Sequence, residues 1–183
     1  MIVLGLALLI GASAYAAAWV GFAIAGRNPA SKAWFPLHML VVAGSMGIAA
    51  GLIGLQALQQ HQVGALGAVA TAMLFVGFLL AGVARQSVEA FTLPVMARVP
   101  SAAGVLVAIA GPLLFMGMLV LGIVTMLGGV LPAWTGAALV AAAVAGGFAA
   151  YVRVPLALHM AVSALGGVVL AYLGLLVVLA SRR

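Results

Sequence analysis

The sequence predicts an all-α membrane protein, a polytopic bundle of about six transmembrane helices. Three observations support this fold class. Of the 183 residues, 68% are hydrophobic and only 4% are charged, whereas a soluble domain carries roughly a quarter charged residues to cover its surface. Long apolar runs follow one another along the whole chain. The basic residues are concentrated in alternate connections between these runs. We therefore expect the lipid bilayer to surround most of this chain.

Each predicted span is an apolar run of about 20 residues, the length that crosses about 30 Å of hydrocarbon. Residues that break helices separate several of them, for example Gly26 to Lys32 and Leu131-Pro132. We treat residues 1–183 as one transmembrane domain. Its predicted spans are residues 2–26, 34–58, 63–84, 102–131, 134–152 and 154–180.

Two segments are expected to depart from a simple span. The connection 85–101 mixes apolar residues with Gln86, Glu89 and Arg98, which predicts a segment lying in the membrane interface. Pro112 falls inside the fourth span, where it predicts a kink and a helix packed inside the bundle, because a neighbour must satisfy the freed carbonyl. Gly47, Gly51 and Gly54 share a helix face that predicts close packing within the bundle.

The orientation follows from lysine and arginine in short connections. Five basic residues fall on one side if there are six spans: Arg27, Lys32, Arg85, Arg98 and Arg153. Arg182 and Arg183 fall on the other side. The majority predicts both termini outside (N-out/C-out), in a multi-pass protein of a bacterial or archaeal cytoplasmic membrane. Seven dispersed basic residues form no patch for nucleic acid.

The residues that are missing exclude several classes of activity. Glu89 is the only acidic residue, and cysteine is absent. Carriers that depend on intramembrane carboxylates, carboxylate-based hydrolases and thiolate metal sites therefore lack their chemistry. The sequence does not decide whether the chain is an enzyme.

Two histidines carry the candidate site. Leu37-His38-Met39 in the second predicted span is echoed by Leu158-His159-Met160 in the sixth, each one turn inside a helix that enters from the same side. An ionisable side chain inside a span is a functional-site hypothesis by default. The pair predicts ligation of one b-type haem iron between two helices. Ser45, Ser163 and Gly166 would line this site, and Arg98 and Arg153 would pair with the haem propionates.

Several interpretations stay open. The first is a small redox subunit that binds this haem and exchanges electrons with quinone or a partner protein. The alternative is a non-redox membrane protein with no cofactor: a transporter or channel for a neutral or anionic solute, or an accessory subunit of a larger complex or homo-oligomer. Both histidines could also serve helix packing alone, by bonding across an interface.

Overall fold

The computed structural model describes residues 1–96, 101–152 and 154–182 of the chain. These residues fold into helices and contain no strand. The helices are α1 (Ile2–Ala25), α2 (Trp34–Phe78), the π-helical segment η1 (Leu79–Arg85), α3 (Gln86–Met96), α4 (Ser101–Gly128), α5 (Ala133–Tyr151) and α6 (Leu156–Ala180).

Within the described residues, five helices are long and apolar enough to span a membrane. Their surfaces suit lipid, because large apolar side chains such as Ile24, Leu127 and Val95 are more than four-fifths exposed. A soluble protein rarely exposes so much contiguous apolar surface. The fold class, a helical bundle compatible with multiple membrane passes, is confirmed at this level.

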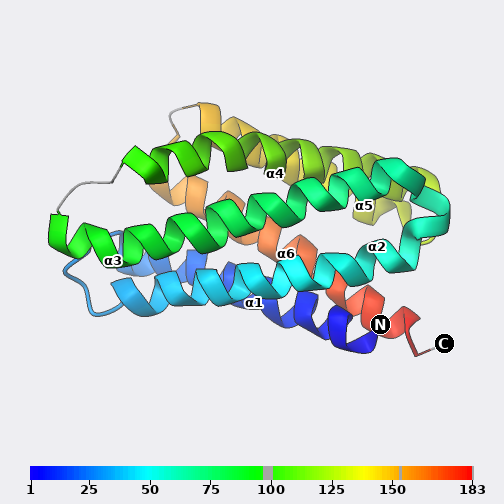
Figure 1. Ribbon diagram of the computed structural model, residues 1–183, viewed down its shortest axis with the longest axis horizontal. Coiled ribbons are helices and arrows are strands. Elements are labelled where there is room, and N and C mark those ends of the chain that lie inside the picture. The colour runs from blue at the N-terminus through cyan, green and yellow to red at the C-terminus, as the bar shows by residue number, and fades with distance from the viewer. Residues whose placement is uncertain (97–100, 153, 183) are drawn as a thin grey trace.

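The second of these helices, Trp34–Met96, is 63 residues long and is not straight. Gly64 interrupts α2 with φ 55° and ψ −147°, a conformation that residues with a Cβ rarely adopt. The chain reverses there, at the right-hand end of Figure 1, so that residues 34–63 and 65–96 form two arms. The predicted break before Val63 is thus a one-residue interruption at Gly64.

The prediction of an interfacial segment after Arg85 is wrong for residues 86–96. These residues form α3, which continues the helix of α2 and η1 without a break. Its polar residues are not spread along a membrane surface, because Gln86 and Glu89 are buried in the bundle. The helix that contains the third predicted span therefore continues beyond Ala84.

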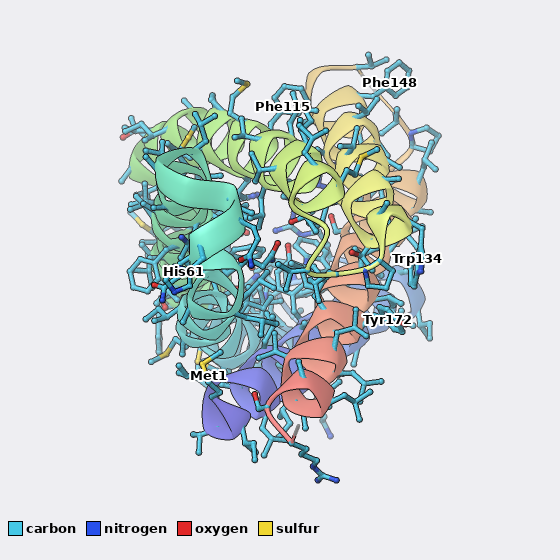
Figure 2. The ribbon with its side chains drawn as sticks, turned by 90° about the vertical axis from the view of Figure 1, so that its right-hand side faces the viewer. Met1, His61, Phe115, Trp134, Phe148 and Tyr172 are labelled. Atoms are coloured by element: carbon cyan, nitrogen blue, oxygen red, sulfur yellow. The ribbon has the colours of Figure 1, made fainter. Side chains whose placement is uncertain are left out.

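The helices are arranged as a closed ring, as the view along the bundle in Figure 2 shows. Helix α1 packs against α2 and α6, α4 packs against α2 and α5, and α5 packs against α6. The two chain ends lie at one end of the bundle, together with the turn at Gly64 (Figure 1). The loop between α1 and α2 lies at the opposite end, which we call the charged end because Arg27, Lys32 and Arg85 lie there.

Small residues bring the helices together. A Cβ on Gly11 would lie 2.7 Å from the backbone of Gly47, and a Cβ on Gly51 would overlap Leu8. Without a hydrophobic driving force between helices in lipid, such close backbone approach supplies the dispersion contacts. The predicted packing of the Gly47, Gly51 and Gly54 face within the bundle is confirmed.

The surroundings of Pro112 differ from the prediction. It lies within the unbroken helix α4, and its side chain is exposed rather than covered by a neighbour. Burial in α4 follows other positions, among them Ala110, Gly117 and Leu121. The prediction that this part of α4 is enclosed by the bundle is therefore wrong at Pro112 itself.

Candidate functional site

A cavity of about 200 Å³ lies between α1, α2, η1, α4, α5 and α6, with Gln86 of α3 also at its wall, toward the charged end. Most of its wall is apolar and built from small residues. A Cβ on Gly111, Gly146 or Gly166 would meet nothing within 4 Å, so these glycines border open space instead of a packed neighbour. Such space within a bundle that is otherwise closely packed is the expected form of a ligand site.

Polar side chains border this cavity at several points of its wall. They come from four different helical elements, and they are Tyr15, Trp19, Arg85, Gln86, His159 and Ser163. The indole Nε1 of Trp19 is buried and has no hydrogen-bond partner in the described part of the chain. Arginine and indole nitrogens only donate hydrogen bonds, whereas Oε1 of Gln86, which is also buried without a partner in the described residues, accepts them.

His159 lies at the cavity, on α6. Its ring meets Trp19 edge-on with the centroids 6.2 Å apart, and its Nδ1 lies 3.4 Å from the carbonyl oxygen of Ala149. Two further predicted residues of α6, Ser163 and Gly166, also line the cavity, and the Ser163 hydroxyl donates to the His159 carbonyl oxygen at 2.9 Å. Three of the seven predicted site residues thus line one cavity.

His38 lies at the same end of the bundle but does not border the cavity. Its side chain is fully buried between the rings of Phe22 and Trp34, with centroids 4.8 and 4.0 Å away. Nδ1 lies 2.9 Å from the Trp34 carbonyl oxygen, and since a carbonyl only accepts, Nδ1 carries a proton. Nε2 has no hydrogen-bond partner in the described residues and lies 3.8 Å from Glu89 Oε2.

In the described residues, aromatic rings of α1 link the two histidines. His38 contacts Phe22, Phe22 contacts Trp19 at 5.7 Å between centroids, and Trp19 contacts His159. The remaining predicted residues are elsewhere. Ser45 is buried against Gly82, and a Cβ added to Gly82 would overlap the Ser45 hydroxyl. Arg98 and Arg153 lie outside the described residues.

An ion cluster that was not predicted from the sequence adjoins the cavity. Glu89 is 2% exposed and accepts a hydrogen bond from Arg85 Nε at 2.9 Å and another from Arg27 Nη2. The two arginines are 22% and 24% exposed. Arg85 and Glu89 are four positions apart, so they share a helix face, and this spacing was the signal that could have revealed the pair. Arg27 could not have been assigned, because it is 62 positions away in the chain.

No group of three or more histidine, aspartate or glutamate side chains that could hold a metal ion occurs in residues 1–96, 101–152 and 154–182. A haem held by both histidines would need His38 Nε2 beside the iron, whereas that atom is buried facing Glu89. The described residues therefore do not fit a bis-histidine haem without a rearrangement of His38.

No protein family model matches this chain, and it matches no curated protein and no solved structure. A function for this chain therefore has to be inferred from its own geometry.

Proposed function

We propose that this chain is a multi-pass membrane protein that binds a small neutral or anionic solute in the cavity bordered by Arg85 and His159, and transfers it through or within the membrane. The observation that carries the proposal is the cavity itself, with apolar walls of small residues and hydrogen-bond donors from Trp19 and Arg85. The fitting solute has an apolar body and an oxygen-bearing end that accepts hydrogen bonds.

The volume limits the size of this solute. A dry apolar cavity of about 150 Å³ holds a molecule such as benzene, so about 200 Å³ suits one ring or a short alkyl chain. Arg85 favours an anionic or carbonyl oxygen, because its guanidinium has several N–H donors. Only Nε donates to Glu89, so other donors of Arg85 remain for a solute.

Six membrane crossings are part of the proposal. The structure has five candidate spanning helices, and one of them, 63 residues long, would measure about 95 Å if straight, about three times the hydrocarbon thickness. The reversal at Gly64 makes two crossings of that helix. Both termini then lie on one side, and the charged end faces the cytoplasm by the positive-inside rule.

Cysteine labelling tests this topology. Because the chain has no native cysteine, Ser31→Cys and Gln60→Cys each introduce a single thiol. We expect an impermeant maleimide added to intact cells to label Gln60→Cys alone, and Ser31→Cys to react only after the membrane is opened. Ile48→Cys, at a fully buried position, is the unreactive control. Labelling of both Ser31→Cys and Gln60→Cys from outside would exclude the six-crossing arrangement.

Fluorescence of Trp19 tests solute binding. In a Trp34→Phe/Trp134→Phe background Trp19 is the only tryptophan, since the chain has three. We expect bromohexanoic acid and its amide, bromohexanamide, to quench Trp19 saturably in nanodiscs. Gly166→Leu fills the cavity and should weaken binding by at least tenfold, an energy of about 1.4 kcal/mol. Gly104→Leu is the matched control, because Gly104 is also open but lies outside the cavity wall. Equal quenching in both variants would overturn the proposal.

The redox subunit with a b-type haem is the second candidate, supported by the placement of His38 and His159 at the same end of the bundle. The visible spectrum of the purified protein separates it from solute binding. A Soret band that disappears in both His38→Ala and His159→Ala would favour haem. A spectrum without this band, together with saturable quenching of Trp19, favours the solute.

A further inference from the structure

Arg85 belongs to two sites at once. It borders the cavity, and its Nε donates a hydrogen bond to Glu89 at 2.9 Å. Glu89 itself does not border the cavity and is 2% exposed. The carboxylate therefore contacts Arg85 without lining the cavity.

The single negative charge of this cluster is shared by two positive ones. Glu89 contributes −1, and Arg27 and Arg85 contribute +1 each, so these three side chains together carry +1. In a water-poor site, an ion a few ångströms away acts far more strongly than it does in water. Glu89 consequently weakens the attraction of Arg85 for an anion, and an anionic solute competes with Glu89 for the same guanidinium.

We propose that Glu89 is the residue that sets the charge preference of the cavity: by holding Arg85 and Arg27, it keeps the site able to take neutral molecules as well as anions. This inference rests on the proposed function, because it concerns the solute of that cavity. Glu89 acts through Arg85 and does not touch the solute, so it is a positioning residue.

A series of variants with graded charge tests the proposal, using Trp19 quenching in the same Trp34→Phe/Trp134→Phe background. The probes are bromohexanoic acid and bromohexanamide, which differ in charge and hardly in shape. Glu89→Gln raises the cluster charge to +2 and keeps an oxygen that can accept from Arg85. Arg27→Gln lowers the charge to 0. The double variant Glu89→Gln/Arg27→Gln returns it to the wild-type value of +1.

The quantity measured is the ratio of the two dissociation constants, that of the amide divided by that of the acid. We expect Glu89→Gln to raise this ratio roughly tenfold and Arg27→Gln to lower it, because each changes the local charge by one unit. The double variant should return close to the wild-type ratio. Size-exclusion chromatography of each variant confirms that the bundle is folded. If one single variant does not fold, the double variant is compared with the other single variant, from which it differs by one unit of charge.

The outcomes separate the role of Glu89 from the function it rests on. Binding of both probes with a ratio that is the same in all folded variants would overturn the role of Glu89 and leave the solute site intact. Saturable quenching by neither probe in any folded variant would overturn the solute site, and the role of Glu89 with it. A ratio that follows the cluster charge supports both.

Discussion

Replacing Gly51 by alanine is expected to destabilise the bundle strongly, although it adds a single carbon atom. A Cβ at Gly51 would overlap Leu8 of α1, including its backbone, which cannot rotate away. Helices α1 and α2 would have to separate along a contact that Gly11 and Gly47 also need. Overpacking of a well-packed interior costs about 1–3 kcal/mol, and a clash with main-chain atoms puts Gly51→Ala at the upper end.

Gly104→Ala is the control for this prediction. Gly104 is also helical, but a Cβ there meets nothing within 4 Å, so this variant should be as stable as the wild type or slightly more stable, because alanine favours a helix. The measurement is thermal denaturation in detergent, followed by the loss of the monodisperse peak in size-exclusion chromatography. Equal denaturation temperatures for the two variants would contradict the close α1–α2 packing.

Removal of the carboxylate by Glu89→Ala should destabilise the bundle about as much as Gly51→Ala does. It leaves Arg27 and Arg85 without their acidic partner and His38 Nε2 beside a void. Breaking a fully buried ion pair costs about 3–5 kcal/mol and an exposed one at most about 1 kcal/mol. With a buried carboxylate and partly exposed arginines, we expect about 2–3 kcal/mol.

A compensating variant distinguishes loss of charge pairing from loss of packing. In Glu89→Gln/Arg27→Gln/Arg85→Gln all three charges are removed, so no unpaired arginine remains, and stability should recover most of the way toward the wild type. The same detergent denaturation applies. If the triple variant is as unstable as Glu89→Ala, the cluster contributes through shape rather than charge.

The fold class was predictable because membrane spans depend on local composition. An apolar run of sufficient length must form a helix in lipid, whatever its neighbours, since the backbone has no other way to satisfy its hydrogen bonds. The segment after Arg85 was not predictable in the same way. Glu89 reads as an interfacial residue until Arg27 is brought to it from 62 positions away, and that long-range contact accompanies the burial of Glu89 in the bundle.

The candidate site was predictable in part for the same reason. The spacing of His159, Ser163 and Gly166 along one helix places them on one face, and the structure gathers them at the cavity. Whether His38 joins them depends on how α1 and α2 pack. Trp34, four positions earlier on α2, and Phe22 of α1 enclose its ring. The contact with Phe22 is not written in the local pattern around His38.

The closed ring of helices also has a consequence for the order of events during synthesis. Helix α1 is made before α2 to α6, yet a large part of its packing surface is contributed by α6: Gly174 lies against Leu9, and Gly167 against Ala12 and Ala16. The cavity likewise combines Tyr15 and Trp19 with His159 and Ser163. Helix α1 must therefore remain in the membrane with an uncovered small-residue face until α6 has been made. A ribosome-bound chain that stops before α6 has neither the finished bundle nor a place for its solute.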